Sequence, residues 1–173
     1  MSQKLENHMK KISVAKVVLN MGVGKSGEPI EQAKRALEQI SGQKPNARNA
    51  KATQRDWGVH KGEPIGVAVT LRRKPAIDLI KRLFVAKGNQ MKGTSFDEFG
   101  NLSFGIREHI DIPGVKYDPQ IGILGLNVSI SLERPGFNIR FRSKHKASVG
   151  SNHRITSEEA KAFLIKEFGI EIM

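Results

Sequence analysis

The sequence predicts an α+β fold in which helices pack on one face of a mainly antiparallel sheet and the other face stays exposed and polar. Strand-like segments alternate apolar and polar residues and have one more polar side, which is typical of an antiparallel sheet covered on one side only. Helix-like segments, with apolar residues at helical spacing, lie between them. No internal repeat or evident linker divides the chain, so we expect a single domain over residues 1–173.

The first third of the chain predicts a strand followed by a helix. Apolar residues alternate with others from Val17 to Val23, which indicates a strand. Pro29 then begins a helix whose apolar residues recur at helical spacing, and Gly42 is its expected C-cap. The polar, basic segment 43–60 has no apolar period, so we expect a loop or an exposed, extended hairpin there.

The middle of the chain predicts a strand, a helix and a second strand. Alternation over residues 67–72 indicates the first strand, and Pro75 begins the helix. The turn pair Gly100-Asn101 leads into the second strand, which contains Phe104 and Ile106. The helix residues expected to face the core are Ile77, Ile80 and Phe84.

The last third contains the clearest strand and the clearest helix start. Apolar residues occupy every second position over 124–132. Arg134-Pro135-Gly136 is a turn signal, and alternation continues over 137–142, so we expect a basic hairpin and loop at about 133–155. A capping box at Thr156 begins a final helix that ends at Gly169. The residues that it should bury are Ala160, Phe163, Leu164 and Phe168.

The charge of the chain predicts an anionic partner. It has 29 Lys and Arg against 17 Asp and Glu, a formal net charge of +12, and no cysteine for disulfides or thiolate metal sites. Segment 41–61 carries five basic residues and one acid, and segment 134–154 carries six basic residues and no acid. Aromatic residues make up only 6%, which favours folded RNA, recognised by shape and phosphates, over a base-stacking single-strand module.

The polar side of the predicted sheet is a candidate RNA-binding surface. Its residues could equally be the wet side of an antiparallel sheet, and the pattern alone does not separate the two interpretations. The side chains concerned are Asn20, Thr70, Arg72, Asn127 and Ser129.

Two phosphate-loop patterns overlap between the first strand and the first helix. Gly22 to Gly27 matches G-x-G-x-x-G, but no second strand ending in an acidic residue follows at the required spacing. Gly24-Lys25-Ser26 resembles a Walker A loop, but Leu19 stands where that motif needs glycine. A turn whose amides and Lys25 hold an RNA phosphate fits the remaining sequence better.

Other functions remain as alternatives to RNA binding. These are an NTPase, a nucleic-acid chaperone or DNA-compacting protein, a membrane-surface binder, and a basic surface that serves solubility alone. The histidines are scattered, and Glu108-His109 with Asp111 is interpreted as a surface charge cluster, so we expect no metal, no cofactor and no catalysis. Met1 to Lys11 lacks an apolar stretch and no run approaches membrane-spanning length, so we expect a soluble, cytoplasmic protein without membrane contact.

Several motifs that occur in a fixed order point to a particular protein family more specifically than composition does. Five short motifs follow one another along the chain: Leu19-Asn20-Met21-Gly22-Val23-Gly24, Ser41-Gly42-Gln43-Lys44-Pro45, Gly62-Glu63-Pro64-Ile65-Gly66, Val69-Thr70-Leu71-Arg72 and Phe104-Gly105-Ile106-Arg107-Glu108. Each motif is weak alone, but the ordered set resembles the family of the universal large-subunit ribosomal protein number five, in its archaeal and eukaryotic form. The resemblance runs from about Ile12 to the C-terminus.

The resemblance implies a structural ribosomal protein rather than an enzyme. It implies a ribosome-bound protein in the central protuberance that binds 5S rRNA and large-subunit rRNA beside a neighbouring 5S rRNA-binding ribosomal protein. It also implies contact with P-site tRNA through the basic loop at about 44–61, and a bridge to a small-subunit head protein through the region 114–120.

The family's motifs transfer to particular positions of this chain. For 5S rRNA these are Asn20, Gly22, Gly24, Gln43, Lys44, Thr70 and Arg72, of which Asn20, Gln43 and Thr70 correspond to the RNA-facing sheet. The tRNA-proximal residues are Lys51, Arg55, Trp57, His60 and Lys61. Additional rRNA contacts are expected from Arg140, Arg142, Lys144 and Lys146.

Overall fold

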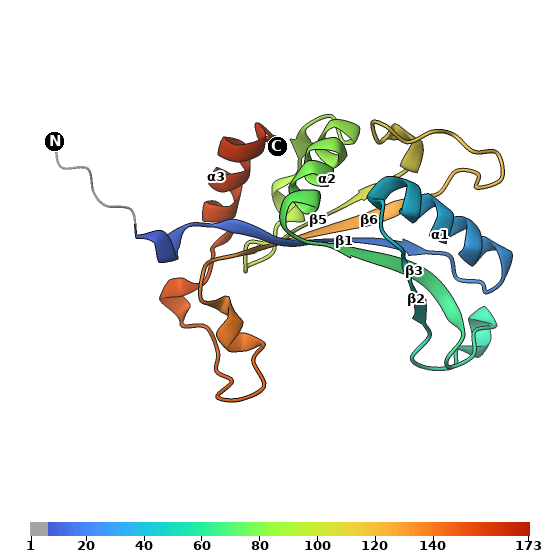
Figure 1. Cartoon of the computed structure of the whole chain (residues 1–173), viewed down its shortest axis with the longest axis horizontal. Coiled ribbons are helices and arrows are strands. Elements are labelled where there is room, and N and C mark those ends of the chain that lie inside the picture. The colour runs from blue at the N-terminus through green and yellow to red at the C-terminus, as the bar shows by residue number, and fades with distance from the viewer. Residues whose placement is uncertain (1–6) are drawn as a thin grey trace.

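A five-stranded antiparallel sheet forms the centre of the computed structural model, which describes residues 7–173 (Figure 1). Its strand order is β2-β3-β1-β6-β5, so the first long strand lies in the middle and each neighbour runs antiparallel to it. The strands are β1 (Ser13–Gly22), β2 (Asn46–Asn49), β3 (Pro64–Leu71), β5 (Leu102–Ile106) and β6 (Leu126–Glu133). The predicted α+β class is confirmed.

Three helices lie on the same side of this sheet (Figure 1). They are α1 (Glu28–Ser41), α2 (Arg73–Ala86) and α3 (Ser157–Phe168). Gly42 ends α1 in the left-handed conformation, with φ of 65°, and the capping box at Thr156 begins α3, both as the sequence predicts. The short strands β4 (Gln90–Met91) and β7 (Glu171–Ile172) form a separate parallel pair.

The hydrophobic core fills the space between the sheet and the helices. Alternate residues of the central strands, such as Leu19 and Val128, are fully buried, and so are Leu37 of α1 and Leu164 of α3. Each strand therefore directs its apolar side chains to the helices and the intervening side chains away from them. This division leaves one side of the sheet without a helix.

The prediction for α2 is wrong at one residue. Ile80 and Phe84 are buried as expected, but Ile77 is 39% exposed. The helix begins at Arg73, before Pro75, and its buried face passes through Ala76 instead. Ile77 therefore lies at the edge of that face, where the side chain remains in contact with solvent.

The prediction of strand structure after Glu133 is wrong. Residues Phe137–Arg140 form a 3-10 helix, η5, and the rest of 134–155 is loop apart from the short 3-10 helix η6 (Ser151–His153). Gly136 adopts a φ of 97° and turns the chain away beyond the end of β6 before a hairpin can form. Phe141, expected on an apolar strand face, is consequently exposed.

Segment 43–60 forms the predicted exposed hairpin. β2 pairs antiparallel with β3, and residues 50–63 form the loop that connects them. This loop and segment 134–155 both project from the side of the sheet opposite to the helices, one at each end (Figure 1). The two basic regions thus flank the uncovered face.

Candidate nucleic-acid interface

The uncovered side of the sheet, here called the open face, is lined by rows of small and polar residues. The strand registers align them across neighbouring strands. One row contains Asn46, Ala68, Asn20, Asn127 and Gly105. The next contains Thr70, Val18, Ser129 and Ser103, in which the Ser103 hydroxyl donates to the Ser129 hydroxyl at 3.2 Å.

The ends of the open face carry cationic side chains. Lys16 lies opposite Ser131 at one end, and Arg48 lies opposite Gly66 at the other. Gly66 itself must be glycine, because a Cβ there would lie 2.9 Å from the backbone oxygen of Met21. The open face therefore combines amide and hydroxyl groups in the middle with positive charge at both ends.

The structure brings four of the expected 5S rRNA residues to this face. Asn20 and Thr70 are exposed on it, and Gly22 lies at the end of β1 beside Gly66. Arg72 follows β3 with extended backbone and keeps the strand alternation that puts it on the side of Thr70. The expected position of Gln43 in the RNA-facing sheet is wrong, because this residue lies in the connection between α1 and β2.

Lys44 lies on the other side of the sheet edge. It lines a shallow groove on the helix side together with Arg35 and Glu38 of α1. Gln43 and Lys44 therefore border the open face at its β2 edge rather than belonging to it. An RNA bound to the open face could contact Gln43 or Lys44 only if it extended around the β2 edge of the sheet.

The turn after β1 is not arranged as a phosphate loop. The amides of Val23 and Gly24 both donate to the backbone oxygen of Ile65, at 3.0 and 2.8 Å, so they are already used. The Ser26 hydroxyl donates to the carboxylate of Glu63, and Glu28 and Glu31 occupy the first turn of α1. Two amides of this turn are therefore unavailable to a phosphate, and the nearby carboxylates disfavour a second anion, so the turn gives little support to the expected phosphate contact.

The loop 50–63 displays its cationic and aromatic side chains to solvent. Trp57 is 79% exposed, and the other residues expected to lie near tRNA, Lys51, Arg55, His60 and Lys61, are exposed as well. Its backbone is nevertheless internally bonded: Gln54 pairs with Val59, and the Lys61 amide donates to the Thr53 hydroxyl at 3.1 Å. The loop thus presents these side chains from a hydrogen-bonded backbone.

Glu63 closes the base of this loop. The His60 amide, which donates to its carboxylate at 3.0 Å, and the Ser26 hydroxyl hold the pKa of Glu63 below its ordinary value. Because both donors favour the ionised carboxylate, Glu63 remains charged and bonded at neutral pH. The loop is thereby tied to the start of α1.

Segment 134–155 is anchored to α3 by a largely buried guanidinium. Arg134 is 7% exposed and donates to Glu159 at 2.7 Å and to the backbone oxygen of Arg154 at 3.3 Å. Burial alone would raise the pKa of Glu159, but the Thr156 amide and Arg134 outweigh it and hold that pKa below its ordinary value. His153 adds a bond from its ring to the Pro135 oxygen at 2.8 Å.

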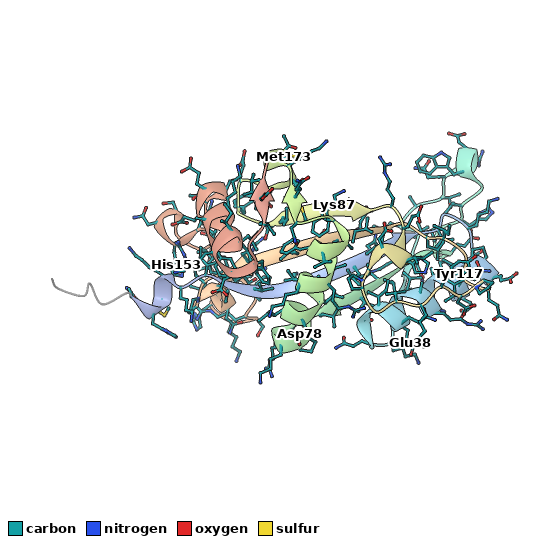
Figure 2. All side chains as sticks on the ribbon, turned by 90° about the horizontal axis from the view of Figure 1, so that it is seen from above. Glu38, Asp78, Lys87, Tyr117, His153 and Met173 are labelled. Carbon is teal, nitrogen blue, oxygen red and sulfur yellow. The ribbon has the colours of Figure 1, made fainter. Side chains whose placement is uncertain are left out.

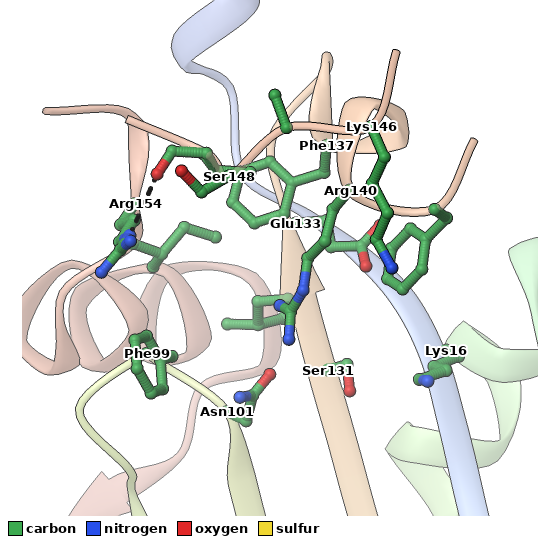
Figure 3. Close-up of a pocket in the computed structure, with 15 residues that line it drawn as sticks. Lys16, Phe99, Asn101, Ser131, Glu133, Phe137, Arg140, Lys146, Ser148 and Arg154 are labelled. Atoms are coloured by element: carbon green, nitrogen blue, oxygen red, sulfur yellow. Dashed lines mark hydrogen bonds between the residues drawn. The ribbon is translucent and has the colours of Figure 1, made fainter. Parts of the chain in front are cut away.

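The four basic residues expected to contact rRNA all lie on the exposed part of this segment. Arg142 donates to the backbone oxygen of His145 at 2.7 Å and so stabilises the turn at the tip. Arg140 and Lys146 line a cavity of about 680 Å³ between the segment and the open face, which Figure 3 shows at close range. Lys144 is exposed but does not line the cavity.

Sequence reasoning missed several residues of the open face. Asn46 and Arg48 were hidden in a segment without apolar period, because an edge strand of four residues is too short to show one. Ser103 could have been found, since it lies between the apolar residues Leu102 and Phe104 in a predicted strand. Lys16 was missed because β1 begins earlier than its apolar alternation suggests.

His109 does not belong to a surface charge cluster. Its side chain is fully buried in the 3-10 helix η4 (His109–Asp111), and its Nδ1 accepts a hydrogen bond from the Leu124 amide at 3.3 Å. Glu108 and Asp111 are exposed. The buried ring therefore holds the connection between β5 and β6 in place.

Neither a membrane-spanning helix nor a metal-binding cluster is present in the described part of the chain. Within residues 7–173, no helix combines the length and the apolar character needed to cross a membrane. In the same range, no three His, Asp or Glu side chains are grouped so that they could hold a metal ion. The first six residues of the N-terminal stretch, expected to lack a signal, lie outside the described range.

Two family models of ribosomal proteins match the chain, one after the other. Residues 7–60 match the family model described as ribosomal protein L5, and residues 64–172 match that of the ribosomal L5P family C-terminus. β1, from the first match, pairs with β3 and β6 from the second, so both matches share one sheet.

Full-length relatives show the same family. The chain is 71% identical to the large ribosomal subunit protein uL5 of Nitrosopumilus maritimus over 172 residues, covering 99% of each chain. It is 66% identical to that of Cenarchaeum symbiosum, over 95% of this chain and 98% of the relative. Identity to that of Pyrobaculum aerophilum is 46%, over 95% and 92%. Matches of this extent, together with the two family models, show that the chain belongs to the ribosomal protein L5 family.

Proposed function

We propose that this chain, a non-enzymatic constituent of the large ribosomal subunit, binds 5S rRNA in the central protuberance through its open face. The observation that carries the proposal is the alignment of exposed Asn, Thr and Ser side chains across neighbouring strands on the side without helices. These groups both donate and accept hydrogen bonds, as recognition of 2′-hydroxyls and base edges in a shallow RNA groove requires.

The basic regions at both ends supply the charge that a folded RNA needs. Lys16 and segment 134–155 lie at one end, and Arg48 with the loop 50–63 lies at the other. Phosphate contacts position a nucleic acid, whereas the sheet groups between them discriminate its shape. We assign large-subunit rRNA to the side chains of segment 134–155 that face away from the sheet.

The loop 50–63 is our candidate for contact with P-site tRNA. Its exposed Trp57 and Arg55 stand at the far end of a hydrogen-bonded hairpin that projects beyond the sheet. The guanidinium of Arg55 suits an RNA phosphate, and the exposed ring of Trp57 offers a surface on which a base can stack. The open face could thus hold 5S rRNA while the loop reaches a second RNA.

The helix side is the candidate surface for proteins. Residues 113–121 pack beside α1 and α2, where Arg82 donates to the Pro113 oxygen at 2.7 Å and Tyr117 is 58% exposed (Figure 2). This surface stays free when RNA occupies the open face. We therefore assign the small-subunit head protein to it, and the neighbouring 5S rRNA-binding protein to the same side of the molecule.

A pair of substitutions tests the open face. Thr70→Val and Asn20→Ala should each weaken 5S rRNA binding by about 1–3 kcal/mol, because a desolvated RNA group loses its partner. Gln39→Ala, an exposed change on α1, is the matched control and should bind like the parent. Parent-like binding by both face variants would remove the open face from the 5S rRNA interface.

The alternative of a general nucleic-acid binder has its own test. Titration of 5S rRNA and of duplex DNA with equal charge, at matched salt, should show tighter binding of the RNA. Equal affinity with equal salt dependence would favour a protein that reads only phosphate charge, such as a DNA-compacting protein.

A further inference from the structure

The cavity between segment 134–155 and the open face has the composition of a nucleotide site. Its volume of about 680 Å³ is in the range of roughly 300–1,000 Å³ typical of small-ligand pockets. Four cationic side chains line it, Lys16, Arg140, Lys146 and Arg154, against one carboxylate, Glu133. The lining therefore favours an anionic ligand over a cationic one.

Aromatic rings line the same cavity. Phe99 and Phe141 are 55% and 61% exposed, although phenylalanine side chains are usually buried. Only 6% of the chain is aromatic, so two exposed rings at one cavity are notable. A guanidinium already lies over each ring: Arg140 Cζ is 5.7 Å from the centroid of Phe141, and Arg154 Cζ is 5.9 Å from that of Phe99. Such rings accept the flat face of a base as well as that of a guanidinium.

Polar groups complete the lining. The Asn101 side-chain nitrogen, Nδ2, donates to the Asp97 carboxylate at 2.7 Å, which fixes the side chain, while its Oδ1 accepts no hydrogen bond within residues 7–173. Figure 3 shows Arg140 extending into the cavity toward Asn101 and Ser131 on the opposite wall. An acceptor and a hydroxyl on one wall, with a guanidinium that reaches toward them from the other, are suited to the edge of a base.

We propose that this cavity takes one unstacked nucleotide of the bound ribosomal RNA, with its base against Phe141 and its phosphate among Lys16, Arg140 and Lys146. A duplex could not enter, because its bases are stacked and the cavity has the size of a small molecule. The proposal rests on the RNA-binding function above and adds a discrete contact to it. The occupant is an unpaired residue of 5S rRNA or of large-subunit rRNA, which share this chemistry.

The test compares chemical probing of 5S rRNA and of large-subunit rRNA, each alone and bound to the full-length chain. With the parent protein, one unpaired nucleotide should change its reactivity strongly on binding. Phe141→Leu should abolish that change and weaken binding of the same RNA by roughly 5- to 150-fold, the range expected for loss of one base–aromatic stack. Phe141→Tyr, which keeps the aromatic face, should retain both.

Charge variants separate the phosphate from the base. Arg140→Ala and Lys146→Ala should each lower the salt slope of binding by roughly 0.7–0.9, the value for one lost phosphate contact, whereas Phe141→Leu should leave the slope unchanged. Lys81→Ala, an exposed lysine of α2 on the helix side, is the matched control and should leave slope and probing unchanged.

The outcomes distinguish this proposal from the proposed function. If the parent binds either RNA but no nucleotide depends on Phe141, the nucleotide site is refuted while RNA binding by the chain stands. If Phe141→Leu behaves as the parent while Arg140→Ala does not, the cavity is a phosphate site without a base. If the parent binds neither RNA, the proposed function fails and the nucleotide site fails with it.

Discussion

The open face and segment 134–155 are both polar and basic surfaces, but different forces hold them in shape. Thr70 and Ser129 are positioned by backbone ladders and by a buried face directly beneath them, so neither depends on a particular side-chain contact. Segment 134–155 has no ladder and depends on a few contacts at its base, chiefly Arg134 with Glu159. A sheet therefore displays a surface that single substitutions alter chemically, whereas an anchored loop displays one that single substitutions can displace.

The largest effect should come from adding charge to the open face. Ser129→Glu places a carboxylate in the row that Ser129 shares with Thr70 and Ser103, where Ser129 is exposed and the fold should tolerate the change. We expect 5S rRNA binding to fall by at least about 100-fold, because like-charge contact at an interface costs several kcal/mol. Thermal unfolding of the variant should match the parent.

Gln39→Glu is the control for Ser129→Glu, since it makes the same change of charge on α1. It should reduce 5S rRNA affinity only through the long-range field, by a small factor that disappears at higher salt. Similar losses in both variants would mean that total charge, rather than the open face, determines binding.

The next effect concerns the anchor of segment 134–155. Glu159→Ala removes the partner of a guanidinium that is only 7% exposed, and it also removes the capping box of α3. We expect the free energy of unfolding to fall by about 1–3 kcal/mol, less than the roughly 3–5 kcal/mol of fully buried pairs, because the Glu159 side chain is 44% exposed. Denaturant titration measures this loss.

A comparison within the capping box sharpens that result. Glu159→Gln keeps an oxygen for the Thr156 amide but loses the charge opposite Arg134. Its loss of stability should therefore be smaller than that of Glu159→Ala yet still measurable. Unchanged stability in both variants would show that the segment does not depend on this contact.

Acid should weaken the same anchor. The pKa of Glu159 and the pKa of Glu63 are both held below the ordinary value of 4.5, so the folded state binds fewer protons at these groups than the unfolded state. Their contribution to stability is complete above that ordinary value and is lost as pH falls through the lowered values. The free energy of unfolding should accordingly decline from about pH 5 downward.

The Glu159→Gln variant identifies the source of this decline. Its stability should depend less on pH below about pH 5 than that of the parent, because one of the two groups no longer titrates. Glu158→Gln, an exposed change of the same kind one residue away, should retain the parent's pH dependence. If the free energy of unfolding fell equally steeply with pH in the parent and in Glu159→Gln, the contact between Arg134 and Glu159 would not be a source of the acid sensitivity.

The sequence predicted the sheet well because its physical signal is local. Alternation along 17–23 and 124–132 reports burial on one side, and register follows once the antiparallel neighbours are known. The helix ends at Gly42 and Thr156 were equally clear, since caps depend on residues within one turn. Asn20 and Thr70 were thus predicted on the polar side of the sheet, where the structure places them.

The remaining parts depend on contacts between distant segments. Alternation over 137–142 looks like a strand, but Gly136 turns the chain away and Arg134 binds a glutamate 25 residues later. Burial of His109 likewise depends on the loop that ends at Leu124. The occupied amides of Val23 and Gly24 depend on Ile65, which no motif at the turn itself reveals.

The smallest effect on isolated 5S rRNA should come from the loop 50–63. Lys51→Ala should leave 5S rRNA affinity unchanged within about twofold, because the proposed 5S contacts use the open face rather than this loop. In assembled ribosomes the same variant should weaken P-site tRNA binding, since a phosphate contact of the loop is lost. Lys146→Ala should behave in the opposite way, with rRNA affinity reduced and P-site tRNA binding retained in subunits that assemble. If Lys51→Ala lost as much 5S rRNA affinity as Thr70→Val, one RNA would span both the sheet and the loop. The division between a rigid face for 5S rRNA and a projecting loop for tRNA would then have to be abandoned.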